Sequence, residues 1–148
     1  MTRITLAAIV GVGLFGLPSI ARETSNPYNL SSRVENIHHG MKEGKYAVDG
    51  KLYIKNNGAN PVENRSFSYS VCFSNKPGHP NACISGNGGL IKKLDPGQEF
   101  SRDMHLKGGN DPTIYVGKSV HIDVNVYDEE REPIYSKGHE IGQIGDYK

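Results

Sequence analysis

The sequence predicts an all-β protein, built as an immunoglobulin-like antiparallel β-sandwich of about seven strands with one disulfide. Three observations favour this fold. Short runs alternate apolar and polar residues, clusters of glycine, proline and asparagine separate the runs, and two cysteines lie near each other in the chain. The chain has 148 residues, of which 36% are hydrophobic, so we expect one small domain.

The first 21 residues have the pattern of an export signal peptide. Arg3 supplies a positive charge, an apolar run extends from Ile4 to Leu17, and small residues stand at Ser19 and Ala21, where signal peptidase requires them. The run is shorter than the roughly 20 apolar residues of a membrane-spanning helix. We therefore expect cleavage after residue 21 and a periplasmic or secreted mature protein without a membrane span.

The charge of the mature chain is balanced. Removal of Arg3 with the signal leaves equal numbers of basic residues (Lys and Arg) and acidic residues (Asp and Glu). Proteins that bind nucleic acids or anionic membranes usually carry an excess of positive charge. We therefore expect no nucleic-acid partner.

Residues 22–44 are expected to form an N-terminal extension or the first strand. A helix from Ser32 to His39 is the alternative, because serine and glutamate stand three residues apart at its start, as in a capping box. Its apolar residues recur at intervals of three and four, namely Val34, Ile37 and Met41. The next strand is expected around Val48 to Ile54, with an interruption near Asp49-Gly50.

The clearest strands are expected at Ser66 to Phe73 and at Ser119 to Tyr127. Every second residue in each run is apolar, which is typical of a strand with one face on the core. The apolar residues are Phe67, Tyr69, Val71 and Phe73 in the first run and Val120, Ile122, Val124 and Val126 in the second. Further strands are expected around Phe100 to Leu106 and at residues 82–85, 89–94, 113–116 and 133–136. The sandwich then covers residues 45–142, and residues 143–148 form a C-terminal tail.

Cys72 and Cys83 enclose ten residues and are expected to form a disulfide. An even number of cysteines in an exported chain favours this pairing. In the chain-entropy model a loop of this size stabilises the fold by roughly 3 kcal/mol. The alternative is a redox pair or a thiolate metal site, which lacks the usual C-x-x-C spacing here.

Three segments resemble the bacterial immunoglobulin-like modules of the cell-adhesion-related (CARDB) type. They are Gly50 to Val62, where a strand runs into an Asn-Asn-Gly turn, then Phe67 to Phe73, and Leu94 to Phe100, which contains a Leu-x-Pro-Gly corner. Gln98 stands where an acidic residue is commonest in that corner. The resemblance covers about residues 45–142 and implies the sandwich fold. It also implies a role in adhesion or binding, which most members of that family serve within larger proteins.

The motifs of common enzyme classes are absent from the sequence. It has no G-x-S-x-G nucleophile motif, no G-x-x-x-x-G-K-S/T phosphate loop and no H-E-x-x-H zinc motif. We therefore expect a non-enzymatic binding or accessory protein, without a cofactor, whose partner is another protein. The expected binding surface is the loop between the cysteines, because two prolines and the disulfide restrain it before binding. Its residues are Lys76, Pro77, His79 and Pro80.

The alternative function is a periplasmic carrier of copper or zinc. The sequence contains six histidines, and imidazole and thioether groups are common ligands of these metals. His38, His39 and Met41 lie within four residues and form the best candidate site, to which His105 or His121 could add a ligand. Asp103 and His105, like His121 and Asp123, are spaced by two and are expected to share a strand face.

Overall fold

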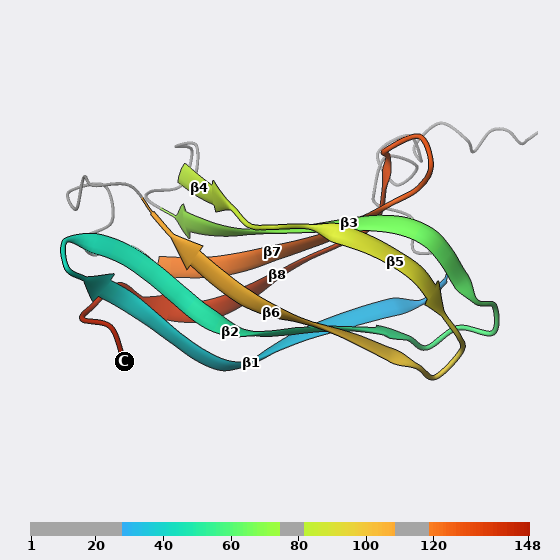
Figure 1. The fold of residues 1–148 in the computed structure, drawn as a ribbon, viewed down its shortest axis with the longest axis horizontal. Coiled ribbons are helices and arrows are strands. Elements are labelled where there is room, and N and C mark those ends of the chain that lie inside the picture. The colour runs from blue at the N-terminus through green and yellow to red at the C-terminus, as the bar shows by residue number, and fades with distance from the viewer. Residues whose placement is uncertain (1–27, 75–81, 109–118) are drawn as a thin grey trace, which may run out of the picture.

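The computed structural model describes residues 28–74, 82–108 and 119–148, and its regular elements in these ranges are eight strands (Figure 1). They are β1 (Leu30–Lys42), β2 (Lys45–Asn56), β3 (Val62–Ser74), β4 (Ala82–Ser85), β5 (Gly89–Leu94), β6 (Glu99–Lys107), β7 (Ser119–Tyr127) and β8 (Pro133–Gln143). In this part of the chain no helix is long and apolar enough to cross a membrane.

The strands form two antiparallel sheets that face each other. The three-stranded sheet has the order β1-β2-β6. In the five-stranded sheet the order is β4-β3-β7-β8, and β5 pairs with another part of β3. The predicted all-β sandwich with a Cys72–Cys83 disulfide is thereby confirmed. The seven strands expected in residues 45–142 correspond in number to β2 to β8, and β1 forms from the segment expected as an N-terminal extension or first strand. The expected strand at 113–116 lies outside the described residues.

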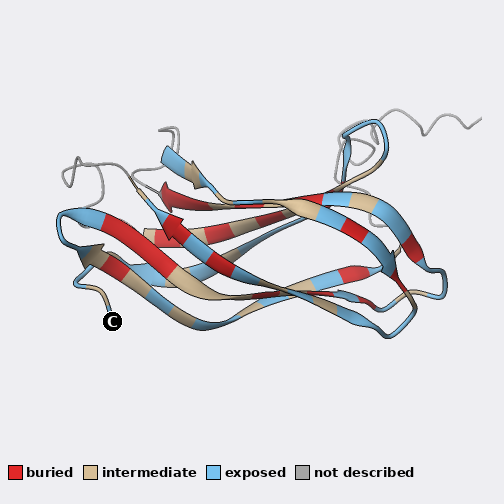
Figure 2. Cartoon of the chain, in the orientation of Figure 1, coloured by how far each residue is buried: buried red, intermediate tan, exposed pale blue. Residues whose placement is uncertain are grey.

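The core lies between the sheets and is made of the residues that the alternation placed on the inner faces. In β7 buried and half-buried residues alternate without interruption. Figure 2 shows the buried residues as separate bands along β2, β3 and β7. Two aromatic contacts join the sheets edge to face: Tyr46 with Phe73 at 4.9 Å and Phe67 with Phe100 at 5.1 Å between ring centroids. Buried apolar side chains of this size each contribute roughly 1.5–3 kcal/mol.

Residues 32–39 form part of strand β1 rather than a helix. Asn36 has a positive φ of 54°, and the β1–β2 register shifts between Glu35 and His38, which marks a β-bulge. The extra residue lets Val34 and Ile37, three apart, both pack against the core. The bulge therefore produces a spacing that imitates the period of a helix.

Strand β2 is continuous through Asp49-Gly50, where an interruption was expected. Gly50 lies on the same side of the strand as Val48 and Leu52. A Cβ atom at residue 50 would lie 2.4 Å from Cδ1 of Ile37. The side chain of Ile37 thus occupies the place of a residue-50 side chain, and the apolar alternation is interrupted without a break in the strand.

The Asn-Asn-Gly turn and the Leu-Asp-Pro-Gly corner pack against each other through Asn56. This residue is fully buried, and its side-chain amide donates to the carbonyls of Asn60 and Leu94. Its backbone carbonyl accepts from the N–H of Gly97. The two turns are far apart in sequence, and their polar groups satisfy each other at one end of the sandwich.

Candidate functional site

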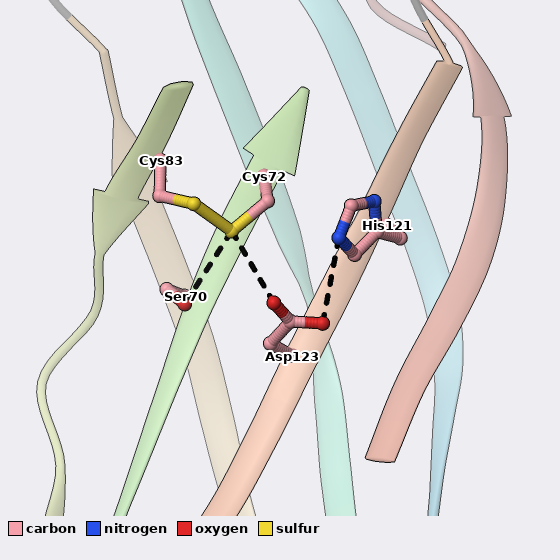
Figure 3. The surroundings of a disulfide bond; sticks show 5 residues. All are labelled: Ser70, Cys72, Cys83, His121 and Asp123. Atoms are coloured by element: carbon pink, nitrogen blue, oxygen red, sulfur yellow. Dashed lines mark hydrogen bonds and ion pairs between the residues drawn. A yellow bond between two sulfur atoms is a disulfide. The ribbon is translucent and has the colours of Figure 1, made fainter. Parts of the chain in front are cut away.

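A compact group of side chains surrounds the disulfide on the outer face of the five-stranded sheet (Figure 3). In the strand register Cys72 lies opposite Cys83 of β4 and opposite His121 of β7. Its Sγ atom is 3.4 Å from Oδ2 of Asp123, and Nε2 of His121 is 3.5 Å from Oδ1 of Asp123. A disulfide sulfur carries no proton, so the contact between Cys72 and Asp123 is close packing rather than a hydrogen bond.

Alternation along two strands places these groups together. Residues 121 and 123 of β7 share one face, and Cys72 of β3 shares it because Val71 and Phe73 point into the core. The outer face of a sheet is usually exposed, yet Cys72 is 1% exposed and the side chain of His121 is 14% exposed. We call Cys72, Cys83, His121 and Asp123 the disulfide cluster.

The histidines and methionine predicted to bind metal do not come together as one group. His39 uses both ring nitrogens within the protein: Nε2 donates to the carbonyl of Ile141 at 2.9 Å, and Nδ1 accepts from the hydroxyl of Tyr46 at 2.8 Å. Burial lowers the pKa of His39, and the hydrogen bond to Ile141 only partly opposes this. His38, the next residue in the strand, points to the opposite face and stacks on Tyr147. Met41 packs against the core.

His38 instead belongs to a row of polar residues across the outer face of the three-stranded sheet. The register places it opposite Asp49, which lies opposite His105 on the other side. Asp49 accepts hydrogen bonds from Nδ1 of His105 and, at 2.6 Å, from the hydroxyl of Tyr147. Burial alone would raise the pKa of Asp49, but these two hydrogen bonds and the charges of His105 and Lys42 lower it. We call Asp49, His105 and Tyr147 the tail cluster, because Tyr147 belongs to the C-terminal segment.

A groove of about 500 Å³ runs between the edge strands β1 and β8. Half-buried apolar side chains line it together with His39 and the charged residues Glu140, Asp146 and Lys148. The apolar residues are Val34, Ile37 and Ile141. The C-terminal segment borders the groove, because the amide of Met41 donates to the carbonyl of Gly145 and the amide of Tyr147 donates to the carbonyl of Met41. Figure 1 shows this segment returning beside the end of β1.

Ser32 connects the edge strands β1 and β8 through side-chain hydrogen bonds. Its hydroxyl lies 2.7 Å from the hydroxyl of Tyr135 and 2.7 Å from Nε2 of His139. Burial and the charge of Lys137 lower the pKa of His139, while the charge of Asp123 opposes them. Nε2 of a neutral His139 can accept from the serine hydroxyl when the proton is on Nδ1.

The structure does not test the predicted binding loop. Lys76, Pro77, His79 and Pro80 lie outside the described residues. The groove and the tail cluster were not predicted. The only sequence feature related to the groove was the helix-like apolar spacing in residues 34–41, which favours the helix alternative. Nothing near Tyr147 in the sequence indicated its contact with Asp49.

The sequence matches no protein-family model, and it matches no curated protein. Solved structures with a similar chain trace include the ApaA protein from Bordetella pertussis, 16% identical, with a TM-score of 0.45 over 81% of this chain and 96% of that one. A β-glucuronidase from Bacteroides uniformis is 8% identical, with a TM-score of 0.46 over 77% of this chain and 13% of that one. Spo0M, a sporulation control protein from Bacillus subtilis, is 11% identical, with a TM-score of 0.43 over 78% of this chain and 49% of that one.

Proposed function

We propose that this chain is an exported, non-enzymatic binding protein, and that it binds another protein through the groove between β1 and β8. The observation that carries the proposal is the set of half-buried apolar side chains in that groove. Residues 45–142 also resemble immunoglobulin-like modules, most of which serve in adhesion or binding. The disulfide fits an oxidising compartment outside the cytoplasm.

The groove favours a peptide segment whose side chains, rather than its backbone, make the contacts. An incoming strand would need regular free edges, but Asn36 in β1 and Gly142 in β8 have positive φ values and interrupt both edges. Apolar side chains could instead pack on Val34, Ile37 and Ile141. Of the three charged residues in the lining, two are acidic, so the preferred segment carries apolar residues flanked by basic ones.

His39 acts in this groove as a structural residue. Both of its nitrogens are engaged within the protein and its pKa is lowered, so it stays neutral at pH 7. Neutral His39 adds no charge to the groove and leaves its preference to the carboxylates of Glu140 and Asp146. A general base would need a free nitrogen directed at a substrate.

A library of random linear peptides displayed on phage tests the proposal directly. We expect the purified protein to retain peptides with apolar and basic residues, and Ile141→Asp to weaken their binding roughly tenfold or more. Leu90→Asp is the matched control, since Leu90 is 50% exposed on β5, away from the groove. Circular dichroism checks that both variants fold.

The same peptides separate the groove from the loop predicted from the sequence. A Lys76→Ala/His79→Ala variant should bind them as tightly as the unaltered protein if the groove is the site. Binding that is lost in the loop variant and kept in Ile141→Asp would assign the partner to the loop. Peptides that bind all variants equally, or no retained peptide at all, would contradict the groove.

A further inference from the structure

The disulfide cluster brings three kinds of metal ligand to one place. One ligand atom each from Cys72, His121 and Asp123 lies within 4.8 Å of the others. Zinc binds such atoms at about 2.0–2.3 Å, so ligands at the corners of its tetrahedron lie roughly 3.3–3.8 Å apart. Sγ of Cys72 lies 3.4 Å from Oδ2 of Asp123, and Nε2 of His121 lies 3.5 Å from Oδ1 of the same carboxylate, so each ligand is at this spacing from one of its two oxygens. The remaining separation, between the sulfur and the imidazole nitrogen, is at most 4.8 Å.

The surroundings keep this group together on the face of the sheet. Cys72 is buried although it points away from the core, and the side chain of His121 is almost covered. The neighbouring strand β8 presents Gly138 opposite Asp123. A Cβ atom at residue 138 would lie 3.1 Å from Oδ1 of Asp123, so a larger residue than glycine would crowd the carboxylate.

The disulfide bond prevents the sulfur of Cys72 from acting as a metal ligand. As long as the Sγ atoms of Cys72 and Cys83 are bonded, neither is a thiolate, and only thiolates bind metals strongly. We propose that reduction of this disulfide converts the cluster into a zinc site, with Cys72, His121 and Asp123 as ligands and Cys83 as the fourth. The inference is independent of the groove and of its protein partner.

The reducing step balances with a dithiol as the reductant. One thiolate of the dithiol attacks a sulfur of the protein disulfide, forming a mixed disulfide and releasing the other cysteine as a thiolate. The second thiolate of the dithiol then attacks the reductant sulfur of the mixed disulfide and releases the remaining cysteine thiolate. The reductant becomes its own disulfide, and the protein gains two electrons and two protons as Cys72 and Cys83 thiols. Zn²⁺ then replaces the thiol protons, which pass to solvent. Cys83 is exposed, so a dithiol can reach the bond.

The donor set selects zinc among the common metals. Calcium and magnesium prefer sites made of oxygen ligands alone, whereas copper(I) prefers sulfur ligands. Zinc accepts thiolate, imidazole and carboxylate in one tetrahedral site. A mixed set of this kind, with two sulfurs, one nitrogen and one oxygen, therefore fits Zn²⁺ best.

Zinc affinity in the two redox states tests the proposal. The purified, tag-free protein is titrated with ZnCl₂ against a chromogenic chelator, once oxidised and once reduced with a phosphine, which binds zinc far more weakly than a dithiol does. We expect about one zinc per reduced chain and roughly a hundredfold weaker binding by the oxidised chain. Co²⁺ in place of zinc should give the charge-transfer absorption of a thiolate–metal bond in the reduced protein only.

Matched variants identify the ligands. His121→Ala and Asp123→Asn should each weaken zinc binding roughly tenfold or more. His105→Ala and Asp103→Asn change the same residue types, also two residues apart, on β6 of the other sheet, and should leave zinc binding unchanged. Equal binding by reduced and oxidised protein, or binding that is insensitive to His121→Ala and Asp123→Asn, would overturn the proposal.

Single cysteine variants remove any dependence on the reductant. Cys83→Ala leaves Cys72 as a thiol beside Asp123 and should bind zinc without a phosphine, whereas Cys72→Ala should not, because only Cys72 contacts the carboxylate. If circular dichroism shows that reduction unfolds the chain, the comparison of these two variants decides. Failure of Cys83→Ala to bind zinc more tightly than Cys72→Ala would then overturn the proposal.

Discussion

The outer faces of the two sheets each carry a histidine and an aspartate spaced by two residues, but the pairs meet different surroundings. On β7, Asp123 lies beside His121, whose side chain is 14% exposed. On β6, Asp103 is 88% exposed and pairs with Lys51, while His105, 73% exposed, pairs with Asp49 across the strands. The difference arises from the neighbouring strand, which presents the Cys72 disulfide to one pair and Asp49 to the other.

The comparison teaches that spacing along a strand sets the face but not the partner. Directly opposite residues on neighbouring strands lie closer together than residues two apart on the same strand, so the register decides which side chains interact. Around His121 the partners are a buried sulfur and a carboxylate with room beside Gly138. Around His105 they are a carboxylate and the returning C-terminal segment.

The largest difference between the two faces should come from the covalent bond. Replacing both cysteines by alanine should lower the free energy of unfolding by about 3 kcal/mol, because the open loop gains entropy in the unfolded chain. Urea unfolding of the oxidised protein and of the Cys72→Ala/Cys83→Ala variant measures this loss.

A neighbouring pair on the same strands controls for the loss of side-chain contacts. Ser70 and Ser85 lie opposite each other, two residues from the cysteines on the same two strands, so Ser70→Ala/Ser85→Ala alters these strands without breaking a covalent bond. We expect a loss of at most about 1 kcal/mol for it. Similar losses in the two double variants would mean that the disulfide stabilises the large sheet no more than ordinary cross-strand contacts do.

The tail cluster should give a smaller effect that depends on pH. Asp49→Asn removes the charge that accepts from His105 and Tyr147, and we expect a loss of about 1 kcal/mol at neutral pH after allowing for solvent screening at this partly exposed site. The hydrogen bonds lower the pKa of Asp49 in the folded state. Its contribution is therefore complete above the pKa of an unfolded aspartate, about 4, and is lost as the pH falls through the lower folded value.

Urea midpoints of the two proteins at neutral and acid pH test this sign. The difference between unaltered protein and Asp49→Asn should be present near neutrality and close on acidification. Asp103→Asn is the control, since Asp103 shares a face with His105 but is highly exposed. A difference that persists below the folded pKa of Asp49 would show that its charge is not what stabilises the tail cluster.

Strand alternation was sufficient to predict the core and the sandwich, because each apolar residue in β3 and β7 has one face to fill. It failed in β1, where the bulge at Asn36 gave Val34 and Ile37 a helical spacing. The disulfide could be predicted from the two cysteines and the expected export of the chain. The contacts of Cys72 with Asp123 could not, because they depend on the β3–β7 register, which no local pattern specifies.

The tail cluster also shows what the sequence left open at the C-terminus. Residues 143–148 have no alternation, yet Asp146 pairs with Met41 and Tyr147 reaches Asp49. These contacts join segments about a hundred residues apart and consist of single polar groups. The prediction of a C-terminal tail at residues 143–148 therefore gave no indication that Gly145, Asp146 and Lys148 line the groove, because tertiary contacts alone place them there.

The smallest effect should come from one hydroxyl on each face. Tyr147→Phe removes the bond to Asp49 but keeps the ring stacked on His38, and we expect a loss of about 0.5 kcal/mol or less in global stability. Locally, the amides of Met41 and Tyr147 should exchange hydrogen faster, since both hold the C-terminal segment to β1. Tyr127→Phe is the matched control on the other face, where the hydroxyl meets Ser68 at 2.9 Å. Unchanged exchange at Met41 in Tyr147→Phe would mean that the backbone bonds alone hold the segment and that the tail cluster does not shape the groove.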